Sequence, residues 1–399
     1  MVNLRTRQIW GVTIVVGILL CTSCKKESQS EEVIVENPDS THVTLETPTS
    51  WEKSFGTGYL DIGNCVRQTA DGGYVIVGYT FSFEEGGDVY LIKTDANGKV
   101  LWHKTYDGDG LGNFVEITND GGFIIAGSTI SSDDSDDRDC YLIRTDSRGD
   151  TLWTRTYEGF YINSVVHDPD GGYIFSRGFG DTVSVMNIDE EGNTVWERTY
   201  PWIDRCSNTL YRTADEGFII AGLYYGDSSL VQLLKTNSQG DTLWRRYYKA
   251  FYASHDAFCT ASESGYFLAG EGNDGIWIMK MDEAGDSLWT RYLGEKKRMP
   301  YMDCILSLRK TSDGGYILAG GKDLVYNCDV ATEGSLLLIK IDANGDTLWS
   351  REYGGEGGQV GNFVQETSDG GYIVVGVTTT PDGSNTDIYL VKTEPMRRK

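Results

Sequence analysis

The sequence predicts an all-β fold, a seven-bladed β-propeller, from a motif that returns with a period of about 50 residues. Each copy begins with a glycine–aromatic step after a tight turn and ends with a tryptophan in a β-rich run. The aromatic residues of the step are Tyr74, Phe123, Tyr173, Phe218, Tyr266, Tyr316 and Tyr372. The tryptophans are Trp51, Trp102, Trp153, Trp196, Trp244, Trp289 and Trp349.

A single repeat predicts four short strands. Its Gly-Gly and Asp-x-x-Gly segments predict tight turns, because glycine adopts positive φ without steric cost. In the second copy the runs of β-forming residues are 113–118, 123–127, 140–145 and 151–157. Four antiparallel strands per repeat, without helical periodicity, are typical of a propeller blade.

The two ends of the repeat array complement each other. Residues 388–393 read as a third strand that no fourth strand follows, and residues 51–55 read as a fourth strand that no third strand precedes. The N-terminal strand should therefore complete the last blade, which would remove two unpaired sheet edges. This predicts a closed propeller over residues 51–394. An open β-solenoid would not need such complementary ends.

Three sets of residues should serve the fold. We expect the tryptophans to pack between blades, since large aromatic side chains dominate such cores. The Asp-x-x-Gly-Asp turns are interpreted as hairpin turns rather than calcium loops, because each offers too few oxygens for calcium. A ring of ion-paired or solvated cations is expected on the outer strands, two residues after each tryptophan: Lys53, Lys104, Arg155, Arg198, Arg246, Arg291 and Arg351.

The N-terminus predicts export and lipid attachment. Arg5 and Arg7 precede an apolar run, residues 9–20, that is short for a membrane span. A small residue, Ser23, stands directly before Cys24, as in the lipobox of bacterial lipoproteins. We interpret residues 1–23 as a lipoprotein signal peptide and Cys24 as the lipidated residue; the alternative is an ordinary cleaved signal without lipid. Residues 24–50 are polar and acidic and predict a disordered tether.

The charge of the chain limits its partners. Its 35 basic and 59 acidic residues give a net charge of −24. Such a surface repels nucleic acid and anionic lipid, so membrane contact is expected through the lipid anchor alone. The predicted location is the cell envelope, lipid-anchored at the outer membrane and facing either the periplasm or the surface.

The repeats resemble a family of secreted and lipid-anchored bacterial and archaeal propellers with the pattern DGGYIVAGxT…DxYLIKTDxxGDxxWxKTYGG. The similarity is strongest over residues 71–106 and 313–355. It implies a fold and a compartment rather than a chemistry. Residues 94–102 are also similar to the tryptophan-docking motif of PQQ-type propellers. The quinone enzymes of that type usually have eight blades and an adjacent Cys-Cys pair, and this chain has seven repeats and no such pair, so no cofactor is expected.

Two further sites are weaker hypotheses. The loop at residues 131–139 gathers carboxylates that could bind calcium, although an acidic loop is more often simply solvated. Its candidate ligands are Asp133, Asp134, Asp136, Asp137 and Asp139. Cys304 and Cys328 should lie on one face of the same blade, where a disulfide could hold a long loop in place.

The loops predict a binding face. Loops between second and third strands are long in the first, second, sixth and seventh copies, which are contiguous around a ring. Opposite them, three successive inter-blade loops are rich in aromatic and cationic residues, which are enriched at interfaces. The alternative is that these aromatic residues only cover the blade ends. The candidate ligand-binding residues are Trp202, Arg205, Tyr252, His255, Lys296, Lys297, Arg298 and Tyr301.

Together these features predict an envelope lipoprotein that binds a protein or a glycan through its loop-bearing face. No catalytic motif is legible, so the chain is expected not to be an enzyme. The first alternative is a lyase or hydrolase acting on polyanionic glycan at the channel mouth, with Arg205, His255 and Tyr301 as acid–base candidates. The second is a structural scaffold subunit of an outer-membrane assembly.

Overall fold

The computed structural model consists of β-strands and connecting turns. It describes residues 6–9, 12–15, 50–81, 87–106, 110–130, 138–159, 162–179, 182–201, 209–225, 229–249, 258–262, 264–272, 275–293, 302–327 and 330–395. Within these ranges there is no α-helix. The predicted all-β class is therefore confirmed for the part of the chain that is described.

Five antiparallel sheets have four strands each and follow one another along the chain. They are β4 (Asp61–Gln68), β5 (Tyr74–Thr80), β6 (Asp88–Thr94) and β7 (Val100–Tyr106); β8 (Leu111–Ile117), β9 (Phe123–Ile130), β10 (Arg138–Thr145) and β11 (Thr151–Tyr157); β12 (Ile162–His167), β13 (Tyr173–Phe179), β14 (Thr182–Ile188) and β15 (Thr194–Pro201); β16 (Thr209–Arg212), β17 (Phe218–Tyr225), β18 (Ser229–Thr236) and β19 (Thr242–Lys249); β20 (Phe258–Ser262), β21 (Gly265–Gly272), β22 (Gly275–Met281) and β23 (Ser287–Leu293).

The remaining strands of the array form one eight-stranded sheet. Its first part is β24 (Met302–Lys310), β25 (Tyr316–Asn327), β26 (Val330–Ile341) and β27 (Thr347–Tyr353), and its second part is β28 (Gly358–Glu366), β29 (Tyr372–Thr379), β30 (Thr386–Lys392) and β3 (Trp51–Phe55). A single parallel bridge, between Gly334 and Gly358, joins the two parts. The N-terminal strand β3 pairs antiparallel with β30, from Trp51 opposite Lys392 to Phe55 opposite Ile388.

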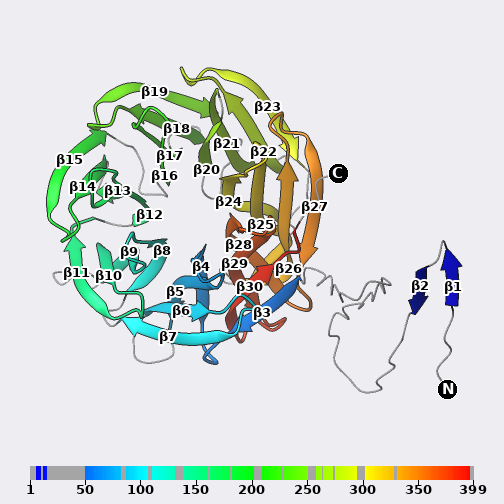
Figure 1. Cartoon of the computed structure of the whole chain (residues 1–399). Helices are drawn as coiled ribbons and strands as arrows, with labels where there is room; N and C mark the ends of the chain where they lie inside the picture. Colours follow the sequence, from blue (N-terminus) through cyan, green and yellow to red (C-terminus); the bar gives the residue numbers. More distant parts are fainter. Residues whose placement is uncertain are drawn as a thin grey trace.

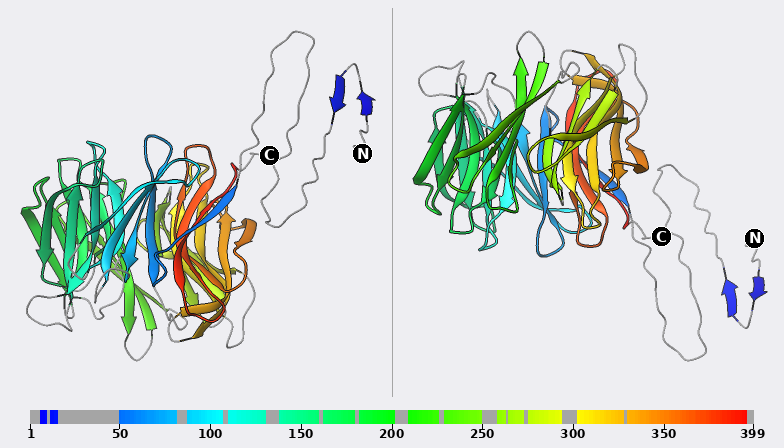
Figure 2. Two further views of the ribbon diagram at one scale, coloured as in Figure 1. Left: turned by 90° about the horizontal axis from the view of Figure 1, so that it is seen from below. Right: turned by 90° about the horizontal axis from the view of Figure 1, so that it is seen from above.

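The sheets stand around a common centre as the blades of a propeller (Figure 1). The first strand of each four lies nearest the centre and the fourth lies on the rim, as β4 and β7 do. Seen from the side, the sheets form a thick disc with loops at both faces (Figure 2). A separate hairpin, β1 (Thr6–Ile9) and β2 (Val12–Val15), lies in the segment predicted to be the signal peptide.

The rim tryptophans pack on the next sheet, as predicted. Trp51 of β3 lies over the turn between β6 and β7, where a Cβ added at Gly98 would come within 2.7 Å of the indole ring. The same indole meets the ring of Tyr74 edge-on at 6.0 Å. Trp102 repeats both contacts one sheet further on, with Gly149 and Phe123. Each indole therefore joins two neighbouring blades.

Five of the seven cations beside these tryptophans form ion pairs within the described part of the chain, in agreement with the predicted outer ring of ion-paired or solvated cations. Arg246 lies 3.7 Å from Asp286 in the turn of the following sheet, and Lys104 pairs in the same way with Asp150. In that same turn, Asp146 accepts hydrogen bonds at 2.8 Å from the backbone N–H groups of Arg148 and Asp150. Its carboxylate therefore stabilises the hairpin, which is the role that the sequence predicted for the Asp-x-x-Gly-Asp turns.

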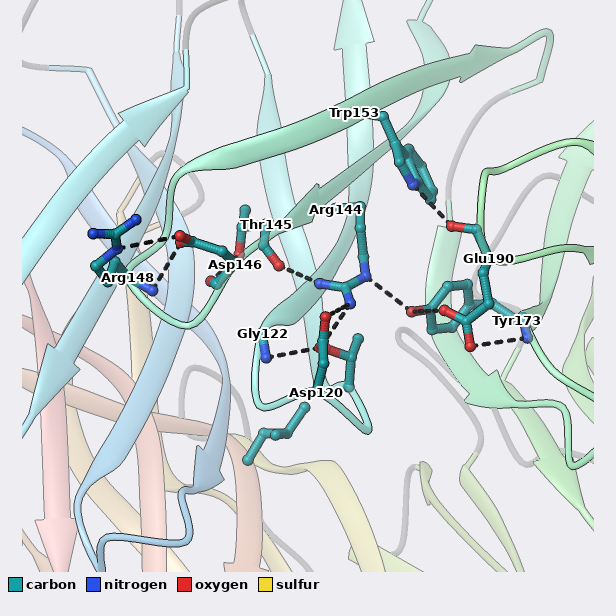
Figure 3. A network of polar contacts seen from close by, with 12 residues as sticks. Asp120, Gly122, Arg144, Thr145, Asp146, Arg148, Trp153, Tyr173 and Glu190 are labelled. Atoms are coloured by element: carbon teal, nitrogen blue, oxygen red, sulfur yellow. Dashed lines mark hydrogen bonds and ion pairs between the residues drawn. The ribbon is translucent and has the colours of Figure 1, made fainter.

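A second network holds the Gly121-Gly122 turn on its own sheet (Figure 3). The guanidinium of Arg144, buried at the end of β10, donates to both carboxylate oxygens of Asp120 at 2.7 Å. Its Nε donates to the hydroxyl of Tyr173 in the next sheet at 3.1 Å. Lys93 makes the equivalent ion pair with Asp71 at 2.9 Å. In these two sheets, a buried cation therefore holds the turn that connects the first strand to the second.

Candidate functional site

A central cavity of about 770 Å³ lies between the innermost strands. Residues from β4, β8, β12, β16, β20, β24 and β28 line it, so every part of the repeat array contributes. In each repeat, one cavity-lining residue lies four positions before the acidic residue of the turn that precedes the glycine–aromatic step. These side chains form the channel ring, which consists of Arg67, Glu116, Val166, Tyr211, Cys259, Arg309 and Gln365.

The charge of the cavity wall is opposite to that of the whole chain. Its described lining includes Arg67, Arg212 and Arg309, whereas Glu116 is the only carboxylate among the described lining residues. Three cations and one anion give +2 when His167 is neutral. In a protein of net charge −24, this is a local concentration of positive charge facing a cavity.

Arg67 is held tightly in the wall. Its guanidinium carbon lies 4.6 Å from the ring centroid of Phe114 and 4.5 Å from that of Phe363. Its Nε donates to Glu116 at 3.0 Å, and its Nη1 donates to the carbonyl of Val66 at 3.2 Å. Two aromatic faces and one carboxylate therefore fix the position of this buried cation.

Arg309 faces the same aromatic ring with fewer partners. Its guanidinium carbon lies 4.3 Å from the centroid of Phe363, and its Nη1 makes one long hydrogen bond, 3.4 Å, to the carbonyl of Leu308. Burial, and then the nearby charge of Arg67, lowers the pKa of Arg309 to about 10. The side chain stays protonated at neutral pH, yet its surroundings do not neutralise it.

Three asparagine side chains in the cavity wall donate hydrogen bonds between neighbouring inner strands. Asn64 Nδ2 donates to the carbonyl of Gly112 at 2.8 Å, and Asn113 Nδ2 donates to that of Ile162 at 3.3 Å. Asn362 Nδ2 donates to the carbonyl of Gly63 at 2.9 Å, which links β28 to β4. These amides are used in binding neighbouring strands, so they serve the wall of the cavity more than its contents.

The thiols near the cavity are poor nucleophiles. Burial raises the pKa of the Cys259 thiol to about 12. Burial also raises the pKa of Cys65, although Arg67 partly opposes this effect. Both groups are protonated at neutral pH, and a thiol reacts as its thiolate. Among the described cavity residues, cysteine chemistry is therefore not favoured.

A second hollow, the outer groove, lies on the rim between the fourth and fifth sheets and has a volume of about 420 Å³. Tyr247 and Tyr292 line it with half of their surface exposed, 50% and 43%. Its other described lining residues include Lys249 and the buried Trp277. Two exposed phenols beside a lysine form a surface that can stack on a ligand and hydrogen-bond to it.

The residues that the sequence proposed as ligand-binding lie outside the described residues. These are Trp202, Arg205, Tyr252, His255, Lys296, Lys297, Arg298 and Tyr301. The outer groove is next to them in the chain: β19 ends at Lys249, shortly before Tyr252, and β23 ends at Leu293, shortly before Lys296. The hypothesis of an aromatic and cationic binding face therefore stays a prediction, and the groove extends it onto described residues.

The other predicted sites also remain untested. Cys24 and the candidate calcium ligands Asp133, Asp134, Asp136 and Asp137 lie outside the described residues, and Asp139 lies in β10. Within the described ranges, no three His, Cys, Asp or Glu side chains gather closely enough to hold a metal ion. Cys304 is buried in β24, and Cys328 lies outside the described residues, so their disulfide stays a prediction.

The charged residues of the channel ring were not among the site residues predicted from the sequence. Their signal was present, because Arg67, Glu116 and Arg309 each interrupt an apolar inner strand four residues before the aspartate of the following turn. Aligning the seven copies on that acidic residue would have shown a position that varies from copy to copy, beside positions that repeat.

Comparisons with known proteins identify the fold class. No protein-family model matches this chain, and no curated protein matches it significantly. It is similar to the solved Dos1 propeller, with 10% identity and a TM-score of 0.50 over 86% of this chain and 95% of that one. It is also similar to Sqt1 from Chaetomium thermophilum, with 12% identity and a TM-score of 0.50 over 87% and 100% of the two chains. A protein from Lactobacillus plantarum matches at 13% identity and a TM-score of 0.50, over 80% and 96%.

Identities this low show the fold alone. The class that the strands and these comparisons define is the β-propeller. The described residues contain no helix that is both long and apolar enough to cross a bilayer.

Proposed function

We propose that this chain is a lipid-anchored protein of the cell envelope whose propeller binds a protein or a glycan through the loop-bearing face beside the outer groove. In this proposal residues 1–23 are a signal peptide, Cys24 carries the lipid, residues 24–50 are a tether and residues 51–394 are the propeller. The chain would belong to the secreted and lipid-anchored propellers that its repeats resemble.

The proposed propeller has seven blades and is closed by β3. The pairing of β3 with β30 supports this arrangement, since it supplies a fourth strand to β28–β30. Hydrogen bonds between the first and last inner strands also support it: the N–H of Gln68 donates to Gln365 Oε1 at 2.9 Å, and the N–H of Ser368 donates to Gln68 Oε1 at 2.7 Å. In this arrangement β3 covers the otherwise open edge of β30, and the edges that the blades keep are short and protected.

The observation that carries the binding function is the outer groove. Tyr247 and Tyr292 expose aromatic surface at a concave position of the rim, with Lys249 beside them. Exposed tyrosines in a hollow are typical of binding sites, because a rigid ring offers contact area at little cost in side-chain entropy. Both tyrosines precede loops whose sequences are rich in aromatic and cationic residues, which extends the same chemistry along one face.

A pull-down from detergent-solubilised envelope tests this function. The intact protein serves as bait beside a Tyr247→Ala, Tyr292→Ala variant. Tyr59→Ala is the matched control, because Tyr59 is even more exposed, at 61%, but lies outside the groove. We expect one protein or glycan to be captured by the native protein and by Tyr59→Ala, and at least tenfold less by the groove variant. Equal capture by all three would refute the groove as the binding site.

The lipid anchor has its own test. Cells that express the full chain are labelled with a radioactive fatty acid, and the protein is compared with Cys24→Ala. Label on the native chain alone, together with release of the variant from membranes, is the expected result. A native chain that carries no label would contradict the anchor and leave the binding function to be judged by the pull-down.

A further inference from the structure

Two guanidinium groups meet at one aromatic ring in the central cavity. Arg67 reaches Phe363 from β4, and Arg309 reaches it from β24, on either side of β28 in the array. Like charges buried together raise the free energy of the folded protein unless an anion lies between them. The described cavity wall supplies one carboxylate, Glu116, and that carboxylate pairs with Arg67.

Arg309, like Arg212, therefore forms no ion pair with a carboxylate among the described residues, and it is the one of the two that lies beside Arg67 on the ring of Phe363. Its contacts within the described residues are the face of Phe363 and one long hydrogen bond to the carbonyl of Leu308. The remaining N–H groups of its guanidinium make no hydrogen bond within the described part of the chain, and the residue lines the cavity. A guanidinium with a free pair of donors is suited to bind a carboxylate through two parallel hydrogen bonds.

Apolar and aromatic side chains make up a large part of the rest of the wall, beside amide and hydroxyl groups such as those of Asn64, Asn113 and Ser307. Phe114, Phe258, Leu306 and Tyr211 line the cavity together with the two arginines. The volume of about 770 Å³ falls within the range of ~300–1000 Å³ found for small-molecule sites. A wall of this kind favours a ligand that carries its charge on an apolar body, rather than a bare hydrated ion.

We propose that the central cavity is a binding site for a small organic carboxylate with an aromatic or aliphatic body, whose carboxylate pairs with Arg309 and whose body lies against Phe363 and Phe114. Arg67 is a positioning residue here, because its ion pair with Glu116 and its two aromatic contacts hold the Phe rings and the positive field in place. This site is separate from the outer groove, so it does not depend on the function proposed for that surface.

Isothermal titration of the protein with 2-naphthoate tests the proposal. The neutral isostere 2-naphthylmethanol and inorganic phosphate are the comparison ligands. We expect 2-naphthoate to bind at least tenfold more tightly than either one, and more weakly as salt is added. Equal affinity for the alcohol would overturn the role of charge, equal affinity for phosphate would overturn the role of the apolar body, and no binding of 2-naphthoate would overturn the site.

Variants then locate the charge. Arg309→Met keeps much of the volume of the side chain and removes its charge, and we expect it to weaken 2-naphthoate binding at least tenfold. The matched control is Arg148→Met, since Arg148 is 80% exposed on a rim turn and should leave the affinity unchanged. Unchanged affinity in Arg309→Met would overturn the assignment.

A second measurement uses the native protein and covers the case in which the variant does not fold. Phenylglyoxal modifies accessible arginines, and peptide mass spectrometry reports where. Bound 2-naphthoate should protect the peptide that contains Arg309 and leave the reaction at Arg148 unaffected. Equal modification of Arg309 with and without 2-naphthoate would argue against the site.

Discussion

The rim and the channel wall of this propeller are built from the same repeats, but they differ in how strictly the repeats agree. On the rim, each fourth strand carries a tryptophan with a cation two residues later, and Trp51 and Trp102 make the same contacts with the next sheet. In the channel ring, seven equivalent positions carry six different residue types, and only arginine occurs twice. The rim positions are needed by every blade, whereas the ring positions are free to form a site.

The largest expected effect comes from breaking a rim contact. Trp102→Ala removes the indole that covers Gly149 and packs against Phe123, and large-to-small changes of aromatic residues cost about 3–5 kcal/mol when fully buried. Because Trp102 is half-buried, we expect a loss of about 3 kcal/mol in the free energy of unfolding, measured in urea. The neighbouring Leu101→Ala, with Leu101 55% exposed, should change it by less than ~0.5 kcal/mol. Similar losses in both variants would contradict the docking role.

The second prediction concerns Gly376, which lies within β29, the second strand of its blade. A Cβ at Gly376 would lie 1.8 Å from the carbonyl oxygen of Val360 in the adjacent inner strand, so Gly376→Ala must push the two strands apart. We expect a destabilisation of about 2–3 kcal/mol by urea denaturation. Gly355→Ala is the matched control, because nothing lies within 4 Å of its added Cβ. That variant should be neutral or slightly stabilising, and a loss comparable to that of Gly376→Ala would contradict the steric explanation.

Acid should weaken the turn network. The hydrogen bond from Thr118, together with those from Gly122 and Arg144, outweighs burial and lowers the pKa of Asp120 to about 2. An unfolded aspartate titrates near ~3.9, so the stability gained from Asp120 is complete above about pH 4 and is lost as the pH falls towards 2. Since the Asp120 side chain is 59% exposed, solvent screening limits this gain to about 1 kcal/mol.

Thermal unfolding between pH 6 and pH 2 measures this effect. Asp120→Asn should lower the midpoint at pH 6 and flatten its fall at low pH. Asp170→Asn is the matched control at the same turn position of the third sheet, where Asn187 binds Asp168 instead, and it should change the acid profile less. Identical profiles for the native protein and Asp120→Asn would show that this turn is not among the acid-sensitive elements.

The smallest expected change in the free energy of unfolding comes from a substitution in the channel ring, and it tests whether the ring is less important for stability than the rim. Tyr211→Phe removes one hydroxyl from the cavity wall and keeps the ring, so we expect the free energy of unfolding to change by less than ~0.5 kcal/mol. Chemical denaturation would measure it. A loss as large as that of Trp102→Ala would mean that the ring is as structural as the rim.

The sequence alone predicted the rim better than the channel. Features repeated seven times, such as the tryptophans and the Asp-x-x-Gly turns, could be recognised because each copy supports the others. The residues of the channel wall could not be derived in this way, because side chains along the inner strands do not alternate strictly between the two faces of the sheet. The register of β4 shifts between Gly63 and Cys65, so Asn64 and Arg67, three residues apart, both line the cavity.

The ligand-binding loops show a different difficulty. Their sequences indicated an aromatic and cationic face, but no repeat fixes the conformation of segments that differ in length from copy to copy. The structure adds the outer groove at the ends of β19 and β23. Tyr247 and Tyr292, which line it, lie on these two rim strands. The fold was therefore predictable from agreement among the repeats, and the candidate sites lie where the repeats disagree.

The pairing of β3 with β30 also sets an order of events in folding. Glu52 and Tyr389, which are hydrogen-bonded across this pair, are 337 residues apart in the chain. The other sheets join neighbouring segments and need only local contacts, whereas β3 can pair only when β30, near the other end of the chain, is available. We therefore expect this pairing to form late in folding, and until it forms β3 is an unpaired strand that could associate with another copy.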